Sequence, residues 1–229
     1  MLRPKKKITK RELKEDTLVL TYFKVQNLIS DYRKQIGIVA VSAVVLLGAG
    51  VVYNNNRTAN EQKAAVELGK VFTYFDNGSY KLAVDGIPEK NFIGLKSIAD
   101  NYGSTPSGEL AMYYLANAYY KLDDYDKSLK YFEEFDTDDE LLKTSTLSGT
   151  AACYEAKGEF LEAAKYFERA ARSTSDKVLL PENLANAARD YILAGKKEKA
   201  VDIFKRIKKE FPESPQLREA ERSLAELSV

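Results

Sequence analysis

The chain has no histidine and no tryptophan, and it has a single cysteine among its 229 residues. Histidine is the commonest general acid–base and the commonest transition-metal ligand, so its absence excludes Ser-His-Asp and Cys-His catalytic sites. A zinc site would have to be built from Cys153 and carboxylates. A lone cysteine also excludes an intramolecular disulfide. These absences predict a protein that is not an enzyme and that uses no cofactor.

Charge is missing from one long stretch, residues 35–56, which reads QIGIVAVSAVVLLGAGVVYNNN. Residues 36–53 are apolar or small throughout, and eighteen helical residues rise ~27 Å, close to the hydrocarbon thickness of a bilayer. We therefore expect a transmembrane helix. A cleaved signal peptide is the alternative, but the preceding region is too long and only a poor cleavage motif, Ala49-x-Val51, is present.

The charges on the two sides of this stretch have opposite balance. Residues 1–34 contain ten Lys and Arg against four Asp and Glu, a net of +6, and since the whole chain is +1 the remainder is −5. Basic residues flanking a single span stay on the cytoplasmic side. We expect residues 1–8 to form a disordered basic head in the cytoplasm and the large domain to be translocated.

An amphipathic helix is predicted over residues 9–34. Thr9 and Glu12 form a Thr-x-x-Glu capping box at its start. One apolar stripe follows, spaced 4, 3, 4 and 3 residues apart: Leu18, Tyr22, Val25, Ile29 and Tyr32. Such a stripe predicts docking, either at the inner membrane interface or against a protein such as a second copy of the chain. The sequence leaves both possibilities open.

From residue 57 onward the pattern is helical, without strand-like alternation, and it repeats. Segments 115–135, 150–170 and 187–207 share one frame, with offsets of 35 and 37 residues. In each segment a small residue is followed three residues later by a tyrosine, then by a turn, a second small residue and a phenylalanine. The small residues are Ala116, Ala151 and Ala188 and then Ser128, Ala163 and Ala200; the tyrosines are Tyr119, Tyr154 and Tyr191; the turns are at Asp123, Gly158 and Gly195; and the phenylalanines are Phe132, Phe167 and Phe204.

This pattern resembles the tetratricopeptide repeat, a helix–turn–helix unit of about 34 residues. The expected fold is all-α: one transmembrane helix over residues 35–56, followed by an α-solenoid. Within it we expect a degenerate unit with an insertion at 57–108, three repeats at 109–212 and a capping helix at 213–229. In the degenerate unit the second helix is expected over residues 91–102, after an insertion at 75–90.

The resemblance implies that partners bind the concave face formed by the first helix of each repeat. The frame assigns seven side chains to that face: Tyr113, Asn117, Tyr120, Lys121, Glu155, Arg189 and Ile192. Family members that grip a terminal carboxylate use a Lys and an Asn on adjacent first helices. Here only Asn117 matches, with Ala152 and Arg189 at its counterparts, so a groove for hydrophobic or extended segments is favoured.

Two charged clusters could indicate other ligands. The run at 136–140 (DTDDE) lacks the glycine of a calcium-binding EF-hand loop, so a solvated loop is expected. The basic residues at 205–209 are expected on an exposed helix face, since the domain is acidic overall. The sequence therefore predicts no metal, no nucleic acid and no small-molecule substrate.

The layout of the whole chain is similar to that of the YfgM-like proteins of bacterial inner membranes. That resemblance implies a periplasmic repeat domain on a single-pass anchor, acting as a scaffold or holdase. Its partners would be the translocon, periplasmic folding factors or secreted chains. An assembly factor or structural subunit of a membrane complex, as in cytochrome c maturation, is the alternative, and a catalytic domain is a third possibility.

Overall fold

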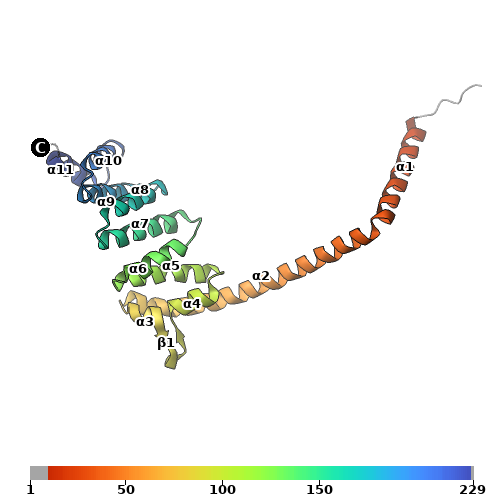
Figure 1. The fold of residues 1–229 in the computed structure, drawn as a ribbon, viewed down its shortest axis with the longest axis horizontal. Helices are drawn as coiled ribbons and strands as arrows, with labels where there is room; N and C mark the ends of the chain where they lie inside the picture. Colours follow the sequence, from red (N-terminus) through yellow and green to blue (C-terminus); the bar gives the residue numbers. More distant parts are fainter. Residues whose placement is uncertain (1–9, 228–229) are drawn as a thin grey trace, which may run out of the picture. The chain divides into compact units, whose positions relative to one another are not determined.

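The computed structural model describes residues 10–227, and it divides at Asn56 into two units that are described separately (Figure 1). Thr9, half of the expected capping box, lies outside the described residues. In the first unit, helix α1 (Lys10–Asp31) ends at a turn on Tyr32, and helix α2 (Arg33–Asp76) begins directly after it. The expected 35–56 segment is therefore not a separate helix but part of α2, which continues to residue 76.

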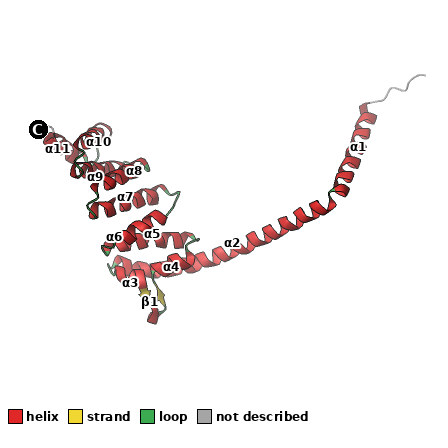
Figure 2. Ribbon diagram, viewed as in Figure 1, coloured by secondary structure: helices red, strands yellow, loops and turns green. Residues whose placement is uncertain are grey.

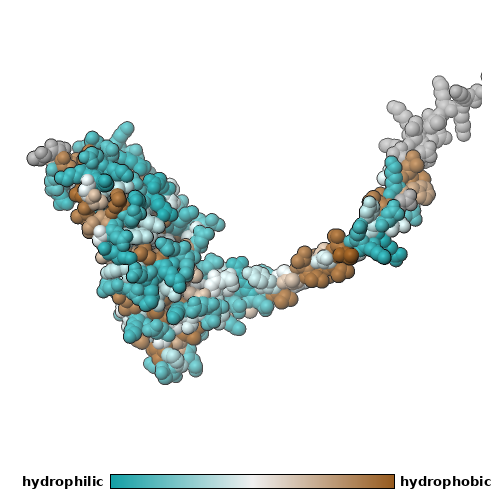
Figure 3. Space-filling view, in the orientation of Figure 1, coloured by the Kyte–Doolittle hydropathy of each residue, from teal (hydrophilic) through white to brown (hydrophobic). Residues whose placement is uncertain are grey.

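The apolar part of α2 is exposed at every position whose side chain the structure describes, with Leu46 72% and Leu47 71% accessible. Among the described residues α2 is the one helix long and apolar enough to cross a bilayer, with a mean hydropathy of 2.4 over its most apolar 18 residues. In Figure 3 this segment is mainly brown, the colour of hydrophobic residues, with some white between.

The apolar side chains of α1 are also exposed, but they are not confined to one stripe. Tyr22, Val25 and Tyr32 are exposed, while the side chains of Leu18 and Ile29 lie outside the described parts. Leu20 and Phe23 are exposed as well. At about 100° per residue, Leu20 lies on the side of the helix opposite Tyr22. The apolar surface of α1 therefore extends around the helix.

The second unit begins with the C-terminal part of α2 and a short insertion. Helix α3 (Tyr80–Asp85) leads into an antiparallel pair of two-residue strands, β1 (Gly86–Ile87) and β2 (Phe92–Ile93), joined by the 3₁₀ helix η1 (Pro88–Lys90). Helix α4 (Leu95–Tyr102) follows. An insertion was expected at 75–90, but the sequence pattern predicted no strands, so the β1–β2 pair is a difference from that prediction. The expected helix at 91–102 begins four residues late because Asn91 is left-handed (φ 49°) and the next two residues pair with β1.

Three helical hairpins and one terminal helix complete the unit (Figures 1 and 2). They are α5 (Pro106–Lys121) with α6 (Tyr125–Glu134), α7 (Glu140–Ala156) with α8 (Phe160–Arg172), α9 (Leu179–Leu193) with α10 (Lys197–Glu210), and then α11 (Leu217–Leu227). Consecutive helices pack on one another, so the predicted all-α solenoid is confirmed.

The turn inside each hairpin has the same geometry. Asp123, Gly158 and Gly195 all have positive φ, at 59°, 77° and 72°, as the predicted turn positions require. In each hairpin the backbone amide of the residue after the turn position donates to the backbone carbonyl of the frame's tyrosine. The N···O distances to Tyr119, Tyr154 and Tyr191 are 3.0, 2.8 and 2.7 Å. This hydrogen bond, which spans six residues, satisfies a carbonyl at the end of the first helix, and the chain reverses direction there.

The predicted packing positions form the core between hairpins. The six small residues of the frame are all fully buried, and Phe132, Phe167 and Phe204 are buried beside them. Their small size lets the paired helices approach, and the aromatic rings fill the remaining space. Tyr119 stacks on Tyr131 and Tyr154 stacks on Tyr166, with ring centroids 5.6 and 5.3 Å apart.

The start of α5 is fixed to α2 by a carboxylate. Glu61 accepts hydrogen bonds from the Ser107 backbone amide (2.9 Å) and from the Ser107 hydroxyl (2.6 Å). Partial burial raises the pKa of Glu61, but hydrogen bonds from Ser107 and Thr105 and the charge of Arg57 outweigh it, so the pKa is lowered overall. The carboxylate thus acts as a cap at the positive end of α5.

Candidate functional site

A groove of about 340 Å³ crosses the first helices of the three hairpins. Its lining is formed by α5, α7 and α9, with one ring from α6. The groove residues are Asn117, Tyr120, Lys121, Phe132, Thr144, Ser145, Ser148, Gly149, Ala152, Leu179, Glu182, Asn183 and Asn186. Because each first helix contributes to it, the groove is a surface that only the stacked hairpins create.

The floor of the groove is built from small side chains on α7. Ser145, Ser148, Gly149 and Ala152 lie within two turns of that helix. Larger side chains border this floor on both neighbours, with Tyr120 on α5 among them. The small side chains of α7 leave free space above that helix.

Amides in the groove are held by the protein's own hydrogen bonds. Asn117 Nδ2 donates to the Tyr113 carbonyl and Asn183 Nδ2 donates to the Leu179 carbonyl, both over 2.8 Å. Asn183 Oδ1 also accepts from the Ser148 hydroxyl at 2.7 Å, which links α7 to α9. The groove is thus preorganised before any ligand binds.

Gly149 is required by the ring beneath the groove. A Cβ at this position would lie 2.4 Å from Phe132 Cζ, so the buried Phe132 ring would have to shift. Gly149 therefore lets α7 pack directly on the α6 ring.

Replacing Gly149 by alanine is expected to destabilise the fold by about 1–3 kcal/mol, because the added methyl group would displace the buried Phe132 ring. Gly69→Ala is the matched control, since nothing lies within 4 Å of a Cβ there and alanine favours the helix. Thermal unfolding of both variants measures the difference. Equal melting temperatures for the two would contradict the packing described.

The structure places the seven predicted side chains in different surroundings. Asn117, Tyr120 and Lys121 line the groove. Tyr113 instead packs on the rings of Phe132 and Phe135, at centroid distances of 6.2 and 5.6 Å.

The other three predicted residues also lie outside the groove. Glu155 is exposed on the last turn of α7. Arg189 pairs with Glu219 of α11 at 3.2 Å, and Ile192 packs against the core cluster around Tyr191. The groove crosses the helices obliquely, from the end of α5 through α7 to the start of α9. Residues at one repeat position therefore do not all reach it.

Sequence reasoning missed the α7 floor and the α9 wall. These positions range from nine residues before the alanines of the frame to one residue after them, so the repeat register contained the signal. The slant between successive hairpins decides which turn faces the groove, and a single repeat does not encode that slant.

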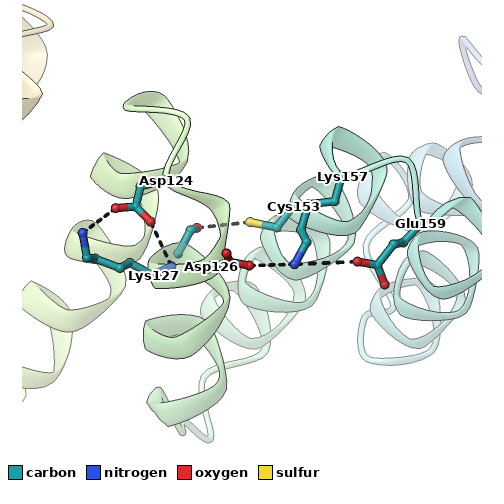
Figure 4. A network of polar contacts seen from close by, with 7 residues as sticks. Asp124, Asp126, Lys127, Cys153, Lys157 and Glu159 are labelled. Atoms are coloured by element: carbon teal, nitrogen blue, oxygen red, sulfur yellow. Dashed lines mark hydrogen bonds and ion pairs between the residues drawn. The ribbon is translucent and has the colours of Figure 1, made fainter.

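Polar contacts on another side hold the first two hairpins together (Figure 4). The Cys153 thiol donates to Ser128 Oγ at 3.1 Å, and that hydroxyl donates to the Ala116 carbonyl at 2.8 Å. Burial raises the pKa of the Cys153 thiol, so it stays protonated as a donor. Lys157 pairs with Asp126 at 2.7 Å and with Glu159 at 3.6 Å.

One buried carboxyl has no such partner. Asp190 on α9 is 1% exposed, and neither of its oxygens has a hydrogen bond. Burial, together with the nearby charge of Glu155, raises its pKa to about 7, although Arg189 opposes the shift. In the preceding hairpins the equivalent positions are Ala118 and Cys153, which are also buried. Asp190 is thus an acidic group at a core position.

Within residues 10–227, at the positions that the structure describes, no group of three or more His, Cys, Asp and Glu side chains is arranged to hold a metal ion. The groove offers hydroxyls, amides, one lysine and one glutamate. These groups can form hydrogen bonds and ion pairs with a ligand.

Comparison with known proteins identifies the repeats. Residues 110–137 and 184–214 match the tetratricopeptide repeat family. These segments contain most of the first hairpin and most of the third, and the second hairpin between them has the same turn geometry. A search of the curated proteins found no match.

Proposed function

Because the chain contains tetratricopeptide repeats, which are protein-interaction units, we propose that it is a membrane-anchored scaffold that binds a segment of a partner protein in the groove. The observation that carries the proposal is the groove itself, which is preorganised, open and formed jointly by α5, α7 and α9. Its small-residue floor suits an extended or helical segment that inserts one bulky side chain.

The apolar part of α2 supports the anchor. An exposed run of this length and hydropathy is costly in water and matches the thickness of a bilayer. The net charge of +6 before it supports a cytoplasmic N-terminus, with the repeat unit on the periplasmic side of a bacterial inner membrane. A reporter fused to the C-terminus tests this orientation, and a cytoplasmic signal would overturn it.

The surface of α1 supports a second contact. A helix that lies at a membrane interface separates its apolar and polar faces. Exposed Leu20 and Phe23 lie away from the stripe of Tyr22, Val25 and Tyr32, so α1 fits packing against a protein better than it fits an interfacial position. We propose that this stripe of α1 packs against a protein on the cytoplasmic side.

Near a translocated domain, the partners of the groove would be secreted chains, folding factors or the translocon itself. Substituting Ala152 with arginine fills the floor and is expected to reduce partner recovery at least tenfold, since it removes the depth that admits the anchoring side chain. The full chain is purified in mild detergent, and the co-purifying proteins are quantified by mass spectrometry.

Ala225→Arg is the matched control, because it places the same side chain on the exposed surface of α11. If Ala152→Arg retains the partners of the wild type, the groove is not the binding surface. Recovery of a defined cytochrome-assembly complex without translocon subunits would replace the translocon role with that of an assembly factor.

A further inference from the structure

One polar contact in the core between the first two hairpins has no counterpart between the second and the third. At the first of these interfaces the Cys153 thiol of α7 donates to Ser128 Oγ of α6 at 3.1 Å. By the repeat frame, the corresponding pair at the next interface is Asp190 of α9 and Ala163 of α8, and both are buried. Alanine has no hydroxyl, so this position cannot satisfy a carboxyl group.

Asp190 is consequently a buried acid without a partner. It is 1% exposed, and neither Oδ1 nor Oδ2 has a hydrogen bond. In the protonated form the carboxyl group carries the desolvation cost of a neutral polar group, whereas in the ionised form it places an unpaired charge in the core. Ionisation therefore favours any opening of the interface that lets water reach Asp190.

The surrounding charges do not compensate an ionised Asp190. Burial is the largest influence on the pKa of Asp190 and raises it, and the like charge of Glu155 on α7 raises it further. Arg189 on α9 lowers this pKa, but its guanidinium also pairs with Glu219 of α11 at 3.2 Å. The balance leaves the pKa at about 7, well above the ordinary 3.8.

Charged side chains of α8 and α10 reach this part of α9 but contact the adjacent Tyr191. Glu168 of α8 accepts a hydrogen bond from the Tyr191 hydroxyl at 3.0 Å, and Lys199 Nζ of α10 lies 4.9 Å from the centroid of the Tyr191 ring. Asp190 receives no hydrogen bond from either helix.

Asp190 lies on the face of α9 that forms one wall of the groove. Asn183 and Asn186 line the groove, and they precede Asp190 by seven and four residues. At about 100° per residue all three lie on one face of the helix. Asn183 also accepts a hydrogen bond from the Ser148 hydroxyl of α7 at 2.7 Å. A movement of α9 away from the second hairpin would break this link and separate the wall of the groove from its floor.

We propose that Asp190 makes the groove pH-sensitive: ionisation of this side chain favours local separation of the third hairpin from the second, which removes the α9 wall and releases a bound segment. Neighbouring repeats are held by their shared interface, so a terminal hairpin can open while the rest of the array stays folded. The release of a segment rests on the proposed function of the groove, whereas the opening itself does not.

The sign of the effect follows from the protonation of the two forms. Asp190 keeps its proton in the closed form up to about pH 7 but loses it near pH 4 once water reaches it, so the closed form loses stability as the pH rises between these values. Above pH 7 the side chain is ionised in both forms, and the ratio of open to closed protein becomes constant.

Hydrogen–deuterium exchange of the full chain in detergent micelles at pH 5 and pH 8 tests the opening without any partner. After division by the intrinsic exchange rate, which itself depends on pH, the amides of α9 are expected to exchange at least about tenfold faster at pH 8. This follows because a raised pKa changes an opening equilibrium by up to about tenfold per pH unit. The amides of α5, in the first hairpin, are expected to change by less than about twofold.

Asp190→Asn is the matched variant, because asparagine has nearly the same shape and carries no charge at any pH. Its α9 amides are expected to show the same corrected exchange rate at both pH values. Asp190→Ala, which introduces the residue of the first hairpin at this position, gives the same comparison if the asparagine variant does not fold. Asp202→Ala removes an exposed acid of α10 and is expected to keep the pH dependence of the wild type.

The release of a segment is measured on the immobilised full chain with its co-purifying proteins bound. These proteins are expected to dissociate faster at pH 8 than at pH 5, by a factor similar to that of the α9 amides, and at equal rates from the Asp190→Asn protein.

Three results would each overturn the proposal: equal corrected exchange of α9 at the two pH values, the same pH dependence in the wild type and the Asp190 variants, or opening of α9 without faster dissociation. Failure of these tests leaves the groove proposal intact, because the Ala152→Arg comparison is made at a single pH. Failure of that comparison would remove the groove as the binding surface and would leave the exchange result unchanged.

Discussion

Replacing Asp190 by alanine is expected to stabilise the protein at pH 8, and to do so by about 3–4 kcal/mol more than at pH 4. The pKa of Asp190 is about 7 in the folded protein against an ordinary 3.8, and each unit of difference corresponds to about 1.4 kcal/mol. Alanine is the residue that the first hairpin has at the equivalent position, Ala118, so the substitution fits the repeat.

The sign of the pH effect follows from which state holds the proton. Between pH 4 and 7 the folded protein keeps Asp190 protonated while the unfolded chain has released that proton, so the folded state loses stability as the pH rises. Above pH 7 the carboxylate is charged in both states, and the full penalty remains. The neighbouring charges are Glu155, which adds to the penalty, and Arg189, which reduces it.

Thermal unfolding of the full chain in detergent, followed by circular dichroism at pH 4, 6 and 8, measures this difference. Asp202→Ala serves as the matched control, because Asp202 is exposed on α10. Parallel stability curves for the wild type and the Asp190→Ala protein across this range would show that the carboxyl is not buried as described.

Placing arginine at both Val44 and Val45 is expected to remove the protein from the membrane. Both residues are exposed near the middle of the apolar part of α2. An arginine at the centre of a span costs about 2.5–3.5 kcal/mol on insertion scales, so two together oppose insertion by about 5–7 kcal/mol. Both residues belong to the first unit, so the repeat unit is expected to fold unchanged.

Fractionation of cells that express each variant provides the measurement. The wild type is expected in the membrane pellet after a high-salt wash, and the double-arginine protein in the supernatant. A variant with arginines at Ala65 and Val66, two exposed positions of α2 beyond the apolar stretch, is the control that should remain in the pellet. Wild-type protein released by salt alone would mean that α2 does not cross the bilayer.

The repeat was predictable because the same physical requirement recurs in each hairpin. A left-handed residue must close each turn and small residues must sit where helices meet, so Gly158, Gly195 and Ala151 stand at fixed offsets. Features that occur once had no such signal. Each strand of the β1–β2 pair has only two residues, and the early end of α6 depends on the extended backbone of Phe135.

The groove was predictable as a surface but only in part as a set of residues. Asn117, Tyr120 and Lys121 reach it, whereas Arg189 turns to Glu219 of the terminal helix instead. That pairing joins residues 30 positions apart and depends on how α11 packs. The repeat frame indicates that Asp190 is at a core position, because its counterparts are Ala118 and Cys153, but its lack of a hydrogen-bond partner depends on the packing around it.

Site-specific photo-crosslinking from the groove tests partner binding most directly. A photoreactive residue at Ser145, on the groove floor, is compared in the full chain in intact cells with one at Lys165, which is exposed on α8 outside the groove. A segment held over α7 predicts a polypeptide adduct from position 145 and none from position 165. Absence of an adduct at 145, or the same adduct from both positions, would contradict binding in the groove.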